Sequence, residues 1–408
     1  MRQIHPRNFQ KAGKATIRRI NRAIVLNVIR NHQPISRAEI ARKTGLRNST
    51  VCLIVDQLVA DGFLEKGVIG PSSGGRKPKL MFLNSEKFLV LGADVGVTDT
   101  ILGVANFNGE IVHQKRFGTD RDPKAFVRQL SSRVRQILEK TATSGCQELG
   151  VSIRGLVDAA SGRIIFTPSL DWKDFDLRSR LEQETHLRVH IENNANACAL
   201  AVMWFGNGHH DAFHDFVYIT VNEGIGGGVV CNGQLVRGRT NGAGEFGHFP
   251  INEDGALCGC GRRGCWQAYA SNVAMVQRYL DGDVSREKRR LQVAMRRLHT
   301  LSVPDLIRLA RGNDPRARKA LFETARYLGI GIATVLDSLD PEALIVGGDI
   351  SLGWELVEPI IRAQVKARAL SPAAAETPIL PSEISGRPGL TGAIALVLGN
   401  QFVVPQVA

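Results

Sequence analysis

Three cysteines and a histidine lie close together in the second half of the chain. The cysteines are Cys258, Cys260 and Cys265, and His248 precedes the first of them by ten residues. Three thiolates and one imidazole complete the tetrahedral shell that structural Zn²⁺ prefers, with no position left open for a substrate. Glycines between the thiols let the backbone turn tightly enough for the sulfurs to face one point. We expect one structural Zn²⁺ per chain; the alternative is a group of buried free thiols.

The chain has 408 residues, which is too long for a single hydrophobic core. No apolar run approaches the ~20 residues that span a bilayer, and the N-terminus lacks the apolar stretch of a secretion signal. We therefore expect two or three domains, a cytoplasmic location and no membrane partner. The other cysteines are isolated in apolar segments, which is typical of reduced core thiols: Cys52, Cys146, Cys198 and Cys231.

The positive charge is concentrated at the N-terminus. Residues 1–83 contain 16 Lys and Arg against four acidic residues, a net charge of +12, whereas the other 325 residues contain 36 against 35. A basic module joined to a nearly neutral body indicates an anionic partner for the module alone.

The basic module has the periodicity of a helix-turn-helix. Apolar residues at helical spacing predict a first helix over about residues 16–31. Ser36 and Glu39 form the capping-box pattern at the start of a short second helix. A third helix follows a glycine turn, with Asn48 or Ser49 as its predicted cap. Two helices joined by a short turn are the arrangement with which many proteins read DNA.

An extended stretch that ends at Leu83 is typical of a two-stranded wing with a turn of Gly, Pro and Ser. Charge, helix order and wing together predict a module that binds double-stranded DNA; the alternative is a protein-docking domain with a solvated basic face. The candidate DNA contacts are Arg47, Lys77 and Lys79 for phosphates, Asn48, Ser49 and Thr50 for bases, Arg76 for the minor groove, and Ser36 and Arg37 at the start of the second helix.

The body contains three apolar strands that each close on a glycine loop, over residues 88–96, 217–228 and 344–348. In an α/β body, such loops are typical of phosphate and nucleoside contacts. Glycine turns after strands also serve close packing, so each loop alone is weak evidence.

The chain resembles the ROK family of repressors, open reading frames and sugar kinases, and within it the repressor branch that has an N-terminal winged helix-turn-helix. The resemblance covers essentially the whole chain, and four segments that occur in family order carry it: residues 73–78, 192–196, 245–248 and 258–265. It implies an α/β body with the two lobes of an actin-like ATPase fold and a sugar pocket between them. The implied domains are residues 1–83 for the winged helix-turn-helix and linker, 84–200 for the first lobe, and 201–408 for the second lobe with the zinc site and with C-terminal helices that return to the first lobe.

The resemblance also implies which residues bind sugar hydroxyls. Glu245 and His248 match sugar contacts of the family, and His248 would use its other ring nitrogen for Zn²⁺. Asn193 would bind a further hydroxyl, while local turn and cap chemistry is the alternative for Glu245 and Asn193. The candidate ligand-binding residues are Arg154, Gly155, Asn193, Asn194, Glu245, His248 and Gln267.

Two departures from the kinase members predict that phosphoryl transfer is lost. After the first strand the kinases resemble Asp-x-Gly-Gly-Thr-Lys, whereas this chain has Val97 and Asp99 at the second glycine and the lysine. Asn194 occupies the position of the kinases' general base, and an amide cannot take the hydroxyl proton, a step worth ~10²–10⁴-fold. We therefore expect a protein that is not an enzyme.

The implied sugar pocket also departs from the family. Gln267 stands where the family has Glu, Arg154 and Gly155 replace a Pro-Gly loop, and Ser169 stands where a sugar-contacting Asn is common. We hypothesise that Arg154 lines the pocket and favours an anionic or modified sugar; the alternative is a solvated surface arginine.

These observations predict a homodimer, or a higher homo-oligomer, that binds a near-palindromic DNA operator and responds to a small-molecule sugar. Such a protein would repress carbohydrate-utilisation genes. Two alternatives are an active sugar kinase with a fused DNA-binding domain, and a regulator controlled by a docking protein rather than by sugar.

Overall fold

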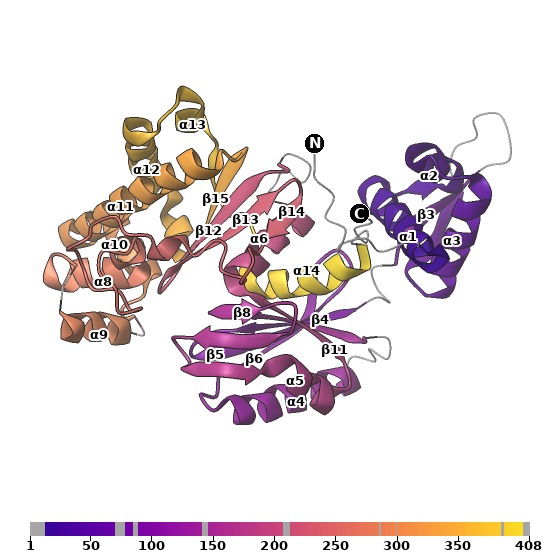
Figure 1. The fold of residues 1–408 in the computed structure, drawn as a ribbon, viewed down its shortest axis with the longest axis horizontal. Coiled ribbons are helices and arrows are strands. Elements are labelled where there is room, and N and C mark those ends of the chain that lie inside the picture. The colour runs from indigo at the N-terminus through magenta and orange to yellow at the C-terminus, as the bar shows by residue number, and fades with distance from the viewer. Residues whose placement is uncertain are drawn as a thin grey trace.

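The computed structural model has a small N-terminal module followed by two α/β lobes (Figure 1). It describes residues 13–69, 78–84, 89–140, 146–206, 213–284, 287–298, 300–384 and 387–402. Among these residues, no helix is both long enough and apolar enough to cross a bilayer.

The N-terminal module is a helix-turn-helix with a small antiparallel sheet. Leu26, Ile40 and Val55, one from each helix, are buried in a shared core. Gly45 ends the second helix with a φ of 69°, a left-handed conformation that favours glycine. The predicted winged helix-turn-helix is confirmed. Its elements are α1 Lys14–His32, β1 Ile35–Ser36, α2 Arg37–Thr44, α3 Asn48–Ala60, β2 Leu64–Ile69 and β3 Lys79–Leu83, with strand order β1-β3-β2.

The start of α3 corrects one prediction. Its N-cap is Arg47, whose side chain makes no capping hydrogen bond, and neither Asn48 nor Ser49 is the cap. The helix begins one residue earlier than a cap at Asn48 requires, so both side chains lie in its first turn and are exposed. The wing residues Arg76 and Lys77 lie outside the described residues.

The first lobe is built on a five-stranded mixed sheet of order β11-β7-β4-β5-β6. The helices α4 and α5 cover one face, and α6 and α14 cover the other. Its elements are β4 Val90–Val95, β5 Asp99–Ala105, β6 Ile111–Gly118, α4 Pro123–Lys140, β7 Glu148–Ile153, α5 Leu177–Thr185, β11 Arg188–Asn193, α6 Asn194–Phe205 and α14 Pro388–Phe402. A smaller sheet of β8 Leu156–Asp158, β9 Arg163–Thr167 and β10 Trp172–Asp176 lies beside them.

The second lobe repeats this plan with the strand order β14-β13-β12-β15-β16. Its strands are β12 Phe216–Val221, β13 Ile225–Cys231, β14 Gln234–Val236, β15 Ala343–Gly348 and β16 Ile379–Pro381. Its helices are α7 Gln267–Ala270, α8 Asn272–Asp281, α9 Lys288–Arg297, α10 Val303–Arg311, α11 Pro315–Leu339, α12 Trp354–Arg368 and α13 Pro372–Glu376, with short 3₁₀ helices at η2 Phe246–His248 and η3 Asp349–Gly353. Two such lobes confirm the predicted α/β actin-like fold.

The module packs directly on the first lobe. Leu26 and Ile29 of α1 share one hydrophobic cluster with Ile394 and Leu398 of α14. The guanidinium of Arg30 lies 4.2 Å from the ring centroid of Trp204, near the end of α6. These apolar and cation–π contacts hold the module against the C-terminal ends of α6 and α14.

The isolated cysteines are less buried than predicted. Cys198 is buried, as expected of a core thiol, and Cys52 and Cys146 are half-buried. Cys231 is exposed because it ends β13 at a tight turn to the edge strand β14.

Candidate functional site

The start of α2 uses two of the candidate DNA contacts within the module. The Ser36 hydroxyl accepts from the Glu39 amide at 3.3 Å, and the Ser36 amide donates to the Glu39 carboxylate at 3.0 Å, which is the predicted capping box. Arg37 donates to Asp56 of α3 at 2.6 Å. Because Ser36 is also buried, these two residues position α2 against α3.

The start of α3 presents polar side chains to solvent. Arg47, Asn48 and Ser49 are exposed, Thr50 is half-buried, and Lys79 on the wing strand is exposed. Figure 1 shows α1 between α3 and α14, so α3 lies on the side of the module away from the lobes. This surface has the charge and polarity that a DNA duplex would require.

The four candidate zinc ligands converge. The Nδ1 atom of His248 is 3.8 Å from Sγ of Cys258, and the Sγ atoms of Cys260 and Cys265 are also 3.8 Å apart. All four donor atoms lie within 4.8 Å of one another. Tetrahedral bonds of about 2.3 Å place neighbouring sulfurs roughly 3.8 Å apart, so the cluster has the size that Zn²⁺ needs.

The protonation chemistry of the cluster also fits a metal. Burial, and the charge of Arg262, lower the pKa of His248, which favours the neutral imidazole that coordinates metals. Burial and the neighbouring thiols raise the pKa of Cys265 to about 12. A dication at the centre would reverse that effect and stabilise the thiolates.

Gln267 connects this cluster to the second lobe's sheet. Its Nε2 donates to Sγ of Cys258 at 3.2 Å, and its Oε1 accepts from the Ile225 amide at 3.3 Å. An amide can do both, whereas the glutamate of the family could only accept. Gln267 therefore lies beside the candidate zinc ligands and forms a hydrogen bond with the start of β13.

Glu245 and His248 lie at the two ends of the short helix η2, which packs against β13. The Nε2 atom of His248, the ring nitrogen that faces away from the cysteines, is 3.9 Å from Oε2 of Glu245. Gly247 permits this approach, because a Cβ there would lie 2.2 Å from the Ile225 carbonyl oxygen. Burial raises the pKa of Glu245. Nε2 of His248 and the Glu245 carboxylate are thus neighbours, while Nδ1 faces Cys258.

Asn193 is engaged within its own turn. Its Oδ1 accepts from the amides of Ala195 and Asn196 at 2.8 and 3.3 Å, which caps α6, and its Nδ2 donates to the Gly155 carbonyl at 2.8 Å. This geometry matches the local cap chemistry considered as the alternative. It also joins two of the predicted ligand-binding residues to each other.

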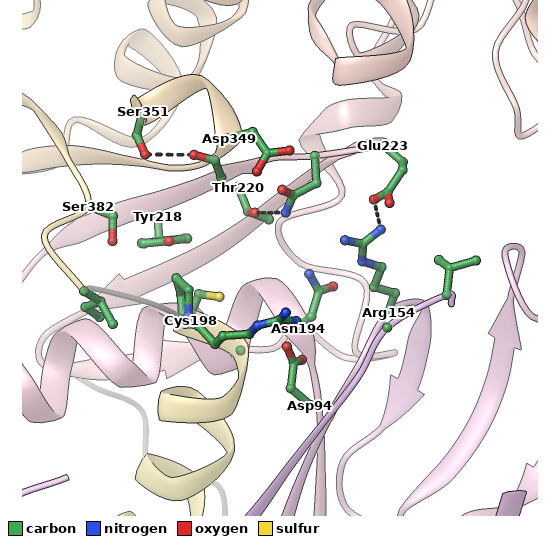
Figure 2. Close-up of a pocket in the computed structure, with 18 of the residues that line it drawn as sticks. Asp94, Arg154, Asn194, Cys198, Tyr218, Thr220, Glu223, Asp349, Ser351 and Ser382 are labelled. Carbon is green, nitrogen blue, oxygen red and sulfur yellow. Dashed lines mark hydrogen bonds and ion pairs between the residues drawn. The ribbon is translucent and has the colours of Figure 1, made fainter. Parts of the chain in front are cut away.

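A cavity of about 550 Å³ lies between the lobes, and we call it the interlobe pocket. It is lined by the ends of β4, β12 and β15, so all three strand-and-glycine-loop segments meet there, at Gly96, Glu223 and Gly348. Arg154 and Asn194 also line it, as Figure 2 shows. Its described lining does not include Glu245, His248 or Gln267, although Gln267 accepts a hydrogen bond from Ile225, two residues after the lining residue Glu223.

An ion pair spans the interlobe pocket. Arg154, which follows β7 in the first lobe, pairs with Glu223, which follows β12 in the second (Figure 2). Its side chain is 31% exposed, so the solvated-surface alternative does not describe it. Sequence reasoning missed Glu223, because its only signal was a position in a glycine loop.

Acidic groups outnumber basic ones in the interlobe pocket. Its described lining contains Asp94, Asp99, Glu223, Asp349 and Glu383 against Arg154 and Arg387. Burial raises the pKa of both Asp94 and Asp349, and the charge of Arg154 opposes this shift. An anionic ligand, which Arg154 alone suggested, would therefore meet more acidic than basic groups in this pocket.

The interlobe ion pair leads to a prediction. Arg154→Ala leaves carboxylates of both lobes facing one another, and we expect it to lower the free energy of unfolding by about 1–2 kcal/mol, since solvent screens part of the effect. In a double-mutant cycle with Glu223→Ala, thermal melting should give a coupling of about 1 kcal/mol. Arg163→Ala, which removes an exposed pair with Asp174 inside the first lobe, is the control and should change little. Purely additive effects of the two pocket variants would contradict the coupling.

The turn between β4 and β5 has no cation where the kinases place a lysine. Asp99 stands there and pairs with Arg116 at 3.2 Å and with Arg387 at 3.4 Å. Arg387 immediately precedes α14, so the ion pair joins Asp99 to the start of the C-terminal helix. A nucleotide phosphate approaching this turn would meet a carboxylate.

The model of the ROK family matches residues 90–400 of the chain. This chain belongs to the ROK family. The ROK match spans both lobes, and the His248 and cysteine cluster is typical of the zinc motif of the family.

Relatives of known type match to different extents. The xylose repressor of Bacillus subtilis (strain 168) is 32% identical over 95% of this chain and 97% of its own length. The glucokinase of Streptomyces coelicolor is also 32% identical, but covers 76% of this chain and 97% of its own length. A solved ROK-family transcriptional regulator, described as a homologue of the E. coli MLC protein, has a TM-score of 0.80 at 23% identity over 95% of this chain and 98% of its own. The ROK repressor match therefore extends through the N-terminal module, and the chain has the architecture of a ROK transcriptional regulator.

Proposed function

We propose that this protein is a sugar-responsive transcriptional repressor that has lost kinase activity. One observation carries the proposal: a DNA-binding module is packed on a sugar-kinase fold in which Asn194 and Asp99 stand at two positions that phosphoryl transfer requires. The module would bind an operator, and the body would bind the sugar.

Zn²⁺ is the proposed cofactor, one per chain, held by His248, Cys258, Cys260 and Cys265. Bound there, it would supply structural cross-linking and no open coordination site. Coordination of the metal by Nδ1 of His248 would fix the orientation of the imidazole ring. Its Nε2 would then stay directed at Glu245.

The proposed ligand is a neutral sugar. Glu245 and His248 provide a carboxylate acceptor and an imidazole nitrogen beside the interlobe pocket, and the acidic balance of the pocket disfavours anions. A pentose is the first candidate, because the matching repressors are named for xylose. Asn194 at the start of α6 would donate a hydrogen bond to a hydroxyl rather than remove its proton.

Two helices connect the interlobe pocket to the DNA-binding module. Asn194 at the start of α6 lines the pocket, and Trp204 near its end contacts Arg30 of α1. Gly389 at the start of α14 lines the pocket, and Leu398 near its end packs in the core shared with α1. A ligand that moved the lobes would shift both helices and thus the module, in proportion to its differential affinity for the two states.

The protein would act on DNA as a homodimer. Two copies of α3 would enter successive major grooves of a near-palindromic operator, about one helical turn or a small multiple apart. Arg47 and Lys79 would contact phosphates, and Asn48, Ser49 and Thr50 would contact bases.

A phosphate contact by Lys79 has a measurable signature. We expect Lys79→Ala to weaken binding to different duplexes about equally and to reduce the slope of log affinity against log salt by about 0.9 per protomer. The control is Lys319→Ala, which removes an exposed lysine of α11 in the second lobe and should leave the slope unchanged. An unchanged slope for Lys79→Ala would remove it from the interface.

Thermal melting of the full chain against a panel of sugars, sugar phosphates and ATP tests the proposal. A ligand at 100 times its dissociation constant adds about 2.7 kcal/mol to stability, which is readily seen. We expect a shift with one neutral sugar and none with ATP. A shift with ATP, together with phosphorylation of the stabilising sugar, would instead support a kinase. No shift with any sugar would support control by a docking protein.

A further inference from the structure

The exposed face of α3 has one apolar side chain at its centre. Leu53 is 73% exposed, whereas Val51, Ile54, Val55 and Leu58 of the same helix are buried in the module core. All residues of α3 are described, and its remaining large apolar residue, Val59, is half-buried. Leu53 therefore takes no part in holding the module together.

The neighbours of Leu53 on that face are polar. Ser49 and Thr50 lie one turn before it, and Asp56 and Gln57 lie one turn after it. Asp56 accepts from Arg37 of α2 at 2.6 Å, and Gln57 accepts from Arg18 of α1. The side-chain oxygens of Asp56 and Gln57 are therefore engaged within the module, whereas Ser49 and Thr50 are the polar residues on the N-terminal side of Leu53.

An exposed leucine among polar side chains on a helix that enters the major groove could contact an apolar group of a base. Among the groups that base pairs present there, the C5-methyl of thymine is the apolar one, and aliphatic side chains contact it. The module carries most of the chain's net positive charge, and α3 lies on its side away from the lobes. A DNA duplex is therefore the partner that both the charge and the position of this face fit.

We propose that Leu53 contacts a thymine methyl group in the major groove and makes the protein selective for thymine at that operator position. The inference rests on the proposed DNA-binding function. Ser49 and Asn48, one turn earlier, would read polar base edges, and Leu53 would read the methyl between them and the Arg37–Asp56 pair. Specificity at that position comes from apolar contact rather than from a hydrogen bond.

The test uses the full-length protein and duplexes that it selects from a random pool. Each thymine of a selected duplex is replaced in turn by deoxyuridine, which lacks only the methyl group. At one position in each half-site we expect wild-type affinity to fall about fourfold, the equivalent of one buried methyl group. Leu53→Ala should bind the thymine and uracil duplexes equally, and Leu53→Met should keep a preference for thymine.

Controls separate this contact from loss of fold or of DNA binding. Leu370→Ala, which truncates an 88% exposed leucine of the second lobe, should retain the wild-type response to uracil. Melting temperatures should match, because Leu53 is not part of the core. The proposal is wrong if the wild type tolerates uracil everywhere, or if Leu53→Ala keeps the full penalty. If no duplex is enriched at all, the DNA-binding function itself fails, and this proposal with it.

Discussion

Cys260→Ser is expected to abolish metal binding and ligand response together. Purified wild-type protein should contain about one Zn²⁺ per chain and the variant close to none, because a neutral serine hydroxyl is a poor substitute for a thiolate. Structural zinc sites contribute apparent binding energies of ~10–16 kcal/mol in isolated fingers. Here the lobes have their own hydrophobic cores, so we expect the free energy of unfolding to fall by less, on the order of 4 kcal/mol. This would be seen as a marked fall in melting temperature.

The loss of ligand response has a separate cause. Without the metal, Nδ1 of His248 is no longer fixed, and Gln267 loses a thiolate partner at Cys258. Both residues contact or flank β13, so the ligand-facing Nε2 of His248 loses its orientation. Cys231→Ser is the matched control, because it removes an exposed thiol from the end of β13 outside the cluster. Metal-free protein that binds sugar with full affinity would disprove the zinc assignment.

Gly392→Ala is expected to disconnect the pocket from the DNA-binding module. A Cβ at Gly392 of α14 would lie 2.1 Å from the backbone oxygen of Ala197 in α6, and a backbone oxygen cannot rotate away. The two helices must then separate, which costs about 3 kcal/mol in a packed interior. We expect a lower melting temperature, retained DNA binding and a DNA affinity that no longer depends on sugar.

The control is the same glycine-to-alanine substitution at a position where the added methyl group has space. Gly118→Ala adds the same methyl group at the end of β6, where the nearest atom is 3.9 Å away. It should melt and respond to sugar as the wild type does. Normal sugar-dependent release of DNA by Gly392→Ala would show that the close contact of α6 with α14 does not carry the response.

The pattern of local signals made several elements predictable. The helix-turn-helix follows from apolar spacing, from the Ser36–Glu39 capping box and from Gly45, all of which act within a few residues. The same is true of the metal cluster, whose four donors lie between residues 248 and 265. The cap of α3 is Arg47, one residue before Asn48 and two before Ser49, and the sequence does not single it out, because several consecutive polar residues could each serve as the cap.

Sequence alone predicted the module, the α/β class and the cluster of four candidate metal ligands, because short spacing and turn chemistry specify them, and its motifs carried the resemblance to the ROK family. Only the tertiary structure decided that Arg154 meets Glu223 across the lobes, and that Arg387 meets Asp99 from 288 positions away. It also decided that α6 and α14 run from the pocket to the module. Such contacts depend on how distant segments pack, and no local pattern of residues encodes that.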